Sequence, residues 1–231
     1  MSGSFPQPQR DAIGMDTQRT APVWDLPTRV FHWSLLPLLA AAWTSAEQGW
    51  MDVHAWCGYS LLTLLLFRIA WGFAGSTHSR FADFLRGPSE VIAHFRGSVR
   101  ERPGHNAAGG WSVMAMLSLL LVQGLTGLFN EDDIAFSGPL SHLAGDLAGA
   151  IHEWHEFNFD LLLVLVLVHV ATILLYLKRG RNLLQAMVWG GVAAPGARRA
   201  PAWHALALLA GAALALWLVL RLLPAPPPVF L

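Results

Sequence analysis

Residues 151–177 read IHEWHEFNFDLLLVLVLVHVATILLYL and decide the fold class of this chain. From Leu161 onward the segment is almost uniformly apolar, and its length matches the roughly 20 residues that a helix needs to cross a bilayer. The alternation of apolar and polar residues that marks a half-buried strand is absent. The stretch therefore predicts a transmembrane helix, and it carries two histidines, His155 and His169, that lie fourteen residues apart.

Four further apolar blocks of similar length occupy about residues 27–46, 52–75, 110–129 and 203–223. Of the 231 residues, 54% are hydrophobic and 13% are charged, which is about half the charged fraction of a soluble domain. The lipid core offers no water to backbone groups, so spanning segments of this kind form helices. We therefore expect an all-α integral membrane protein with five spans.

Charge and cysteine usage exclude several classes of protein. The formal net charge is zero, so no basic surface indicates a nucleic-acid partner. Cys57 is the single cysteine, which excludes an internal disulfide, a cysteine-based zinc or iron–sulfur site, and the C-x-x-C-H attachment of a c-type haem.

Basic residues are distributed unevenly over the connections between the blocks. Fourteen of the fifteen Lys and Arg residues lie before or early in the first block, from late in the second block up to the third, or between the fourth and fifth. The other two connections contain none and carry acidic residues instead. Because cytoplasmic connections are enriched in Lys and Arg, we expect the N-terminus inside and the C-terminus in the periplasm, with Arg221 alone at the outer end.

Three segments outside the spans have a distinct composition. Residues 1–22 are polar and lack the apolar core of a cleavable signal peptide, so we expect a disordered cytoplasmic tail. Residues 76–109 are polar with interspersed apolar residues, which favours a short amphipathic helix at the inner interface. Residues 191–231 add the fifth span and a Pro-rich tail to the domain that precedes them.

Four histidines fall at matching depths when the spans are placed in this orientation. Fourteen residues make nearly four helical turns, so His155 and His169 project from one face about 21 Å apart along the helix axis. His54 begins the second span near the outer surface, at the depth of His155. His32 lies in the inner third of the first span, at the depth of His169.

Two pairs of imidazoles stacked across one membrane are what two b-type haems require. Each iron takes one imidazole from either face of the porphyrin, so His54 with His155 and His32 with His169 would bind the outer and inner haem. A single buried histidine is more often a hydrogen-bonded structural residue than a ligand, and the hypothesis therefore depends on both depth matches.

The remaining polar candidates receive weaker assignments. Arg68 follows His54 by fourteen residues, so it either pairs with the propionates of the inner haem or extends to the lipid headgroups. His152 lies about 100° from the face of His169 and is expected to face the interface. A solvated position is expected for the histidines in loops and at helix ends, namely His78, His94, His105, His142 and His204.

Several motifs in this order resemble one known family, the bacterial cytochrome b561 family, which includes the b-type cytochrome subunits of nickel-iron hydrogenases. The resemblance covers about residues 22–190. Its motifs are Val23-Trp-Asp-Leu-Pro-Thr-Arg-Val-Phe-His32-Trp, His54-Ala-Trp-Cys-Gly-Tyr, Phe-Arg68-Ile-Ala-Trp-Gly-Phe, Arg80-Phe-Ala-Asp-Phe, Gly-His105-Asn with Gly-Gly-Trp111, and His152-Glu-Trp-His155-Glu with His169.

The resemblance implies a four-helix membrane domain over residues 23–190, in the bacterial inner membrane, that holds two haems b and exchanges electrons with quinone. The family's ligand pattern falls on His32, His54, His155 and His169. A hydrogenase, another dehydrogenase or a cytochrome c is the expected redox partner, and the fifth helix offers a place for a further subunit. Whether the chain acts as an enzyme stays open.

Two alternatives belong to other classes of protein. A proton-coupled transporter could use the intramembrane histidines as proton relays and would bind no haem. A non-redox membrane anchor would have no need for the matched histidine depths.

Overall fold

The computed structural model describes residues 22–97, 104–131, 136–191 and 196–223. Its five long helices are α1 (Leu26–Glu47), α2 (Met51–Ala74), α5 (Ala107–Phe129), α6 (Ala148–Lys178) and α8 (Ala202–Leu222). Each of them begins and ends within a few residues of an expected span. The all-helical membrane fold is therefore confirmed.

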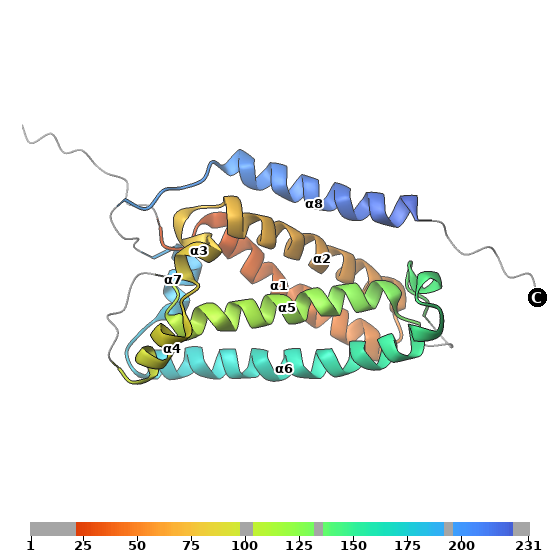
Figure 1. Cartoon of the computed structure of the whole chain (residues 1–231), viewed down its shortest axis with the longest axis horizontal. Coiled ribbons are helices and arrows are strands. Elements are labelled where there is room, and N and C mark those ends of the chain that lie inside the picture. The colour runs from red at the N-terminus through yellow and green to blue at the C-terminus, as the bar shows by residue number, and fades with distance from the viewer. Residues whose placement is uncertain (1–21, 98–103, 132–135, 192–195, 224–231) are drawn as a thin grey trace, which may run out of the picture.

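Four of these helices, α2, α5, α6 and α8, are long and apolar enough to cross a membrane. The expected fifth span, α1, has 22 residues, which at about 1.5 Å per residue also reach across a hydrocarbon core of roughly 30 Å. Its composition is less apolar because it contains residues such as Arg29, His32 and Pro37. It nevertheless lies along α2 inside the bundle (Figure 1).

The centre of the bundle is α2, which packs against α1, α5 and α8. Its side chains Leu62, Leu65, Phe67 and Trp71 are buried and form much of the core. The second close helix pair is α5 with α6. Among the described residues, α6 packs closely against α5 but not against α1 or α2. The pair α1 and α2 is therefore separated from α6 where the histidines lie.

The short elements gather at one end of the bundle (Figure 1). They are the 3₁₀ helix η1 (Thr77–Ser79), α3 (Phe81–Phe84), α4 (Pro88–Phe95) and α7 (Leu183–Trp189). The expected single amphipathic helix within residues 76–109 is therefore divided into three short helices. The opposite end carries the α1–α2 turn and two further 3₁₀ helices, η2 (Ser141–Leu143) and η3 (Gly145–Leu147), which precede α6.

Helix α1 starts at a capping site that is tied into the rest of the protein. Asp25 accepts a hydrogen bond from the Thr28 amide at 3.0 Å, as an N-cap residue does, and a second one from Trp71 Nε1 at 2.9 Å. Burial alone would raise the pKa of the Asp25 carboxyl, but hydrogen bonds from Ser76, Thr28 and Ser79 lower the pKa below its ordinary value. The start of α1 is therefore joined to α2 and η1 through one ionised carboxylate.

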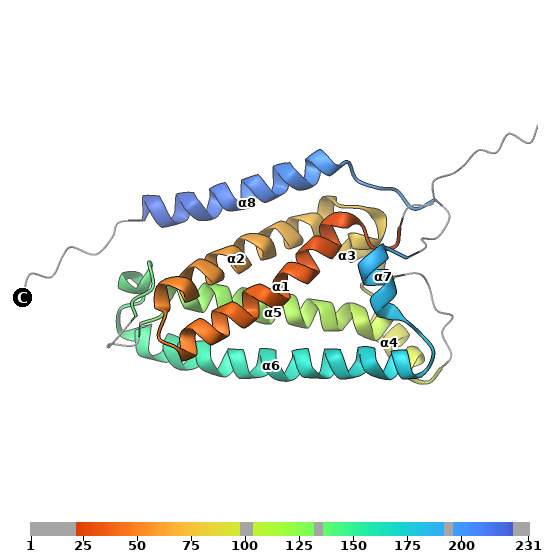
Figure 2. The same ribbon diagram turned by 180° about the vertical axis from the view of Figure 1, so that it is seen from behind.

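Helix α7 closes the same end of the bundle against the start of α1 (Figure 2). The Trp24 amide donates to the Gly190 carbonyl at 2.9 Å, and Trp33 Nε1 donates to the Met187 carbonyl at 3.2 Å. Gly190 has a φ of +98°, and a Cβ there would lie 2.7 Å from Pro22, so glycine is required at this crossing.

Candidate functional site

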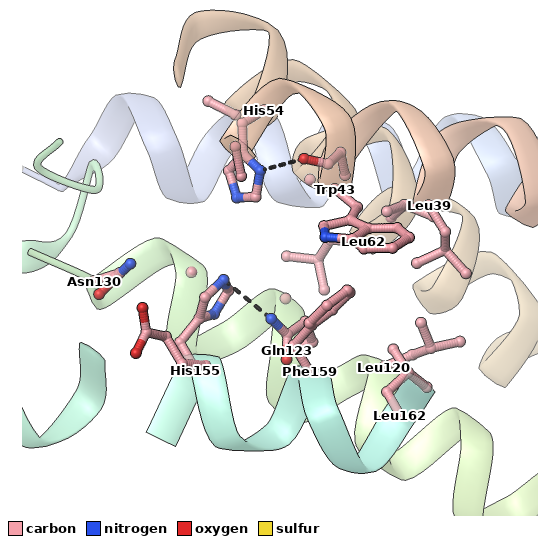
Figure 3. Close-up of a pocket in the computed structure, with 18 of the residues that line it drawn as sticks. Leu39, Trp43, His54, Leu62, Leu120, Gln123, Asn130, His155, Phe159 and Leu162 are labelled. Carbon is pink, nitrogen blue, oxygen red and sulfur yellow. Dashed lines mark hydrogen bonds between the residues drawn. The ribbon is translucent and has the colours of Figure 1, made fainter. Parts of the chain in front are cut away.

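The histidine pair His54 and His155, here called site A, lies in a cavity between α2 and α6. The two ring centroids are 6.2 Å apart, and the rings point into the cavity from opposite walls (Figure 3). The cavity has a volume of about 660 Å³, within the range of small-molecule and cofactor pockets. Apolar side chains form most of its wall, including Leu39, Leu62 and Phe159.

The second pair, His32 on α1 and His169 on α6, is here called site B. Its ring centroids are 6.3 Å apart. Both histidines of α6 therefore face the two helices of the other half of the bundle, as their spacing of nearly four turns predicts. Site B lies toward the end with α3 and α7, and site A lies toward the opposite end.

The hydrogen bonds of site A define the proton positions on both rings. His54 Nδ1 lies 2.8 Å from the Ala42 carbonyl, which can only accept, so His54 carries its proton on Nδ1. His155 Nδ1 lies 2.9 Å from Thr126 Oγ1, while Gln123 Nε2 lies 3.0 Å from His155 Nε2 and can only donate. Both rings therefore have a free-base Nε2, which is the form that binds a metal.

A polar network in the membrane-spanning helices positions Gln123. Asn158, which is 3% exposed, donates to Gln123 Oε1 at 2.6 Å and to the Leu119 carbonyl at 3.0 Å. Gln123, Thr126 and Asn158 were not among the residues expected at the site. The available signal was the presence of amides and a hydroxyl inside apolar spans, where polar residues are rare and are often functional.

Two glycines shape the wall of site A. A Cβ on Gly58 would meet nothing within 4 Å, and this residue lines the cavity. A Cβ on Gly127 would come within 3.1 Å of His155 Cε1. Glycine at these positions therefore leaves room for a flat group in the cavity and for the close approach of His155.

Arg68 is buried inside the protein, which contradicts the alternative that it extends to the lipid headgroups. Its exposed fraction is 3%, its Nη1 donates to the Ser79 carbonyl at 3.3 Å, and its guanidinium lies 5.5 Å from the centre of the Phe81 ring. No described carboxylate lies within 4 Å of it. The charge of Asp25 acts on Arg68 without a direct ion pair, so the guanidinium remains available to an anionic group.

Several histidines that were expected to be solvated are buried. His78 is 8% exposed and lies 2.9 Å from Asp83. His105 packs between Trp24 and Phe84, with centroid distances of 4.5 and 4.7 Å. Burial, with smaller contributions from the charges of Arg68, His169 and His32, lowers the pKa of His105 to about 3, so this ring is neutral.

Two further histidines also differ from expectation. Both ring nitrogens of His142 are buried and have no hydrogen-bond partner among the described residues. His152 does not face only the interface, because it lines the cavity and its Nδ1 lies 3.0 Å from Asn130 Oδ1.

These features define a membrane-embedded helical bundle with two pairs of facing histidines. Residues 23–190 match the family model of the prokaryotic cytochrome b561, and the chain belongs to this family. It is therefore a haem-binding membrane protein of electron transport, of the b-type cytochrome class. Comparison with curated proteins and with solved structures gave no significant match.

The residues of site A fit a haem. The site combines two Nδ1-protonated imidazoles, an apolar cavity and a glycine whose missing side chain leaves the cavity open. At site B, the His32 Nδ1 is buried without a hydrogen-bond partner among the described residues, and the buried Arg68 offers a cation for a carboxylate. The family's cofactor and the local chemistry therefore agree.

Proposed function

We propose that the protein is a di-haem cytochrome in which site A and site B each hold one haem b between two imidazoles. The observation that carries the proposal is the equal spacing of the pairs, with ring centroids 6.2 Å apart in site A and 6.3 Å apart in site B. Imidazole nitrogen binds a transition metal at about 2 Å, so two imidazoles on opposite sides of one iron have centroids roughly 6 Å apart.

Each residue has a distinct role in this proposal. His54 with His155, and His32 with His169, would hold the two haem irons through their ring nitrogens, and the carbonyl of Ala42 holds His54 in the tautomer that a ligand needs. Arg68 pairs with a propionate of the haem at site B. When bound, the haems supply one-electron transfer, while the protein excludes water and sets their potentials.

The two sites give a path for electrons from one membrane surface to the other. Described basic residues lie in the connections α2–α5, α6–α7 and α7–α8. These connections lie at the end of the bundle with α3, α4 and α7 (Figure 1). The positive-inside rule therefore supports a cytoplasmic position for this end and for site B, with site A toward the periplasm. The C-terminal end of α8 then lies on the periplasmic side.

We further propose that quinone and a redox protein exchange electrons with the two haems. Oxidation of a quinol releases protons, and Glu47, Glu156 and Asp160 line the cavity of site A as acceptors. The protein partner would be a hydrogenase, another dehydrogenase or a cytochrome c. The exposed apolar faces of α6 and α8 are available to lipid and to a further subunit.

Haem quantitation and reduced-minus-oxidised difference spectra of the purified protein test the proposal. We expect two haems b per chain. His54→Ala and His155→Ala should remove the same haem, and His32→Ala and His169→Ala should remove the other. His204→Ala is the control, because this ring packs on Trp203 of α8 and outside both pairs.

Three results would contradict this function. A colourless protein would favour the transporter or the anchor, one haem per chain would exclude the second site, and loss of one common haem in all four variants would refute the pairing.

A further inference from the structure

In site A the Nδ1 nitrogen of each histidine donates a hydrogen bond. His54 Nδ1–H donates to the Ala42 carbonyl at 2.8 Å. His155 Nδ1–H donates to Thr126 Oγ1 at 2.9 Å, because the Thr126 hydroxyl hydrogen is already directed to the Val122 carbonyl at 2.8 Å. Donation from Nδ1 makes an imidazole more electron-rich and a more basic metal ligand.

Site B differs from site A in this respect. His32 Nδ1 is buried and has no hydrogen-bond partner among the described residues. At least one ligand of site B therefore lacks the interaction that both ligands of site A have.

The fixed charges around the two sites also differ, because only site A has an excess of acidic residues. Glu47, Glu156 and Asp160 line the cavity of site A. Near site B the buried guanidinium of Arg68 is accompanied by the buried, ionised carboxylate of Asp25, so the two charges offset each other. Negative charge and electron-rich ligands stabilise an oxidised iron, and positive charge stabilises a reduced one, because reduction removes one unit of positive charge.

We infer that site A has the lower reduction potential of the two sites, and that Thr126 is a positioning residue that contributes to this difference. The inference rests on the proposed function, because it requires a haem at each pair. Two independent observations, the hydrogen bonds of the ligands and the acidic residues around site A, give the same order.

The hydrogen bond from Gln123, which lines the cavity, shows that the lone pair of His155 Nε2 is on the cavity side. Its amide donates to His155 Nε2 and is oriented by Asn158. A haem iron held by His155 would be bound through Nε2 in place of this hydrogen bond, and Nδ1 would keep its bond to Thr126. Thr126 therefore acts on the potential through His155 and does not touch the iron.

A potentiometric titration of the full-length protein, followed by visible absorption, tests the order of the potentials. We expect two components, of which His54→Ala and His155→Ala remove the lower and His32→Ala and His169→Ala remove the higher. If the site A variants do not accumulate, the site B variants still assign the remaining component. Removal of the higher component by the site A variants would overturn the inference, whereas absence of haem would overturn the proposed function instead.

Threonine substitutions test the role of Thr126. Thr126→Val should shift the lower component to a more positive potential, and Thr126→Ser should restore it. The matched control is Thr63→Val, because Thr63 on α2 is also half-buried and donates to a carbonyl four residues earlier, that of Tyr59, but has no described hydrogen bond with a histidine. An unchanged or more negative lower component in Thr126→Val, or an equal shift in Thr63→Val, would overturn the assignment of Thr126.

Discussion

Gly127 on α5 lies so close to His155 on α6 that a Cβ at this position would stand 3.1 Å from His155 Cε1 and 3.7 Å from Nδ1. The first distance is shorter than an ordinary van der Waals contact, so an alanine would push the imidazole away from its position. We expect Gly127→Ala to weaken haem binding at site A about tenfold, as changes around a metal ligand commonly do, and to leave site B intact.

Haem titration of the haem-free protein measures this effect. Gly149→Ala is the control, because it makes the same replacement in α6 at a position where a Cβ meets nothing within 4 Å. An equal loss in both variants would show that the effect comes from the helices and not from the contact with His155.

Gly58 provides a test of the space in site A. Its missing side chain faces the cavity, so Gly58→Leu should fill part of the volume that the haem needs while leaving the packing of α2 unchanged. We expect the haem content to fall from two per chain to one, with the retained haem at site B. Gly211→Leu on α8, where a Cβ also meets nothing within 4 Å, should retain both haems. Two haems in Gly58→Leu would exclude the cavity as the haem site.

The buried Arg68 predicts opposite effects in the haem-free and haem-loaded protein. Arg68 is buried without a direct ion pair among the described residues, and Asp25, whose charge acts on it, keeps its own hydrogen bonds in the variant, so Arg68→Met should not lower the thermal midpoint of the haem-free protein. In the loaded protein the same variant loses the partner of a propionate, and we expect an increased rate of haem loss from site B. Thermal unfolding and haem transfer to an acceptor protein measure the two effects.

Arg221→Met serves as the control for Arg68, because Arg221 lies in the last turn of α8, on the opposite side of the membrane from site B in our proposal. If Arg68→Met destabilises the haem-free protein and leaves haem retention unchanged, its role is structural and the pairing with a propionate is wrong.

The Asp25 cap predicts a loss of stability in acid. Because the pKa of Asp25 is lower in the folded protein than its ordinary value, its contribution is complete above the ordinary value and is lost as the pH falls through the lowered one. Asp25→Asn should therefore cost about 1–3 kcal/mol at neutral pH and reduce the difference in stability between neutral and acidic conditions.

Unfolding of the detergent-solubilised protein at several pH values measures the effect of Asp25→Asn. Glu90→Gln is the control, since Glu90 forms only an exposed pair with Arg86 at 3.9 Å, and such pairs contribute little. A pH dependence that Asp25→Asn leaves unaltered would place the acid-sensitive group elsewhere.

The sequence predicts the long helices well because their apolar blocks are as long as the bilayer is thick. It also pairs the four histidines by relative depth, since depth follows from helical rise and from the distribution of basic residues. The ring distances of 6.2 and 6.3 Å agree with that placement. Their role as ligands stays a prediction until a haem is measured at each pair.

The polar neighbours of these histidines were not predictable in the same way. The rotation of an apolar helix about its axis is weakly determined by hydropathy, so the sequence does not reveal that Gln123, Thr126 and Asn158 face His155. The burial of His78 and His105 depends on how the short helices η1, α3 and α4 fold back onto the bundle. Helices this short have no reliable periodicity, so loop positions suggested solvent exposure instead.

The contact between Trp24 and Gly190 has a consequence for how the protein is made. The two residues lie near opposite ends of the domain's sequence, and α7 is the last helix of that domain to be made. At a synthesis rate of about 5–20 residues per second, Gly190 is made on the order of ten seconds or more after Trp24, and the start of α1 lacks this contact until then. During that interval α7 does not yet contact the start of α1, where Trp33 lies beside His32 and bonds Met187, so the newly made chain has time to bind haem before this end of the bundle is complete.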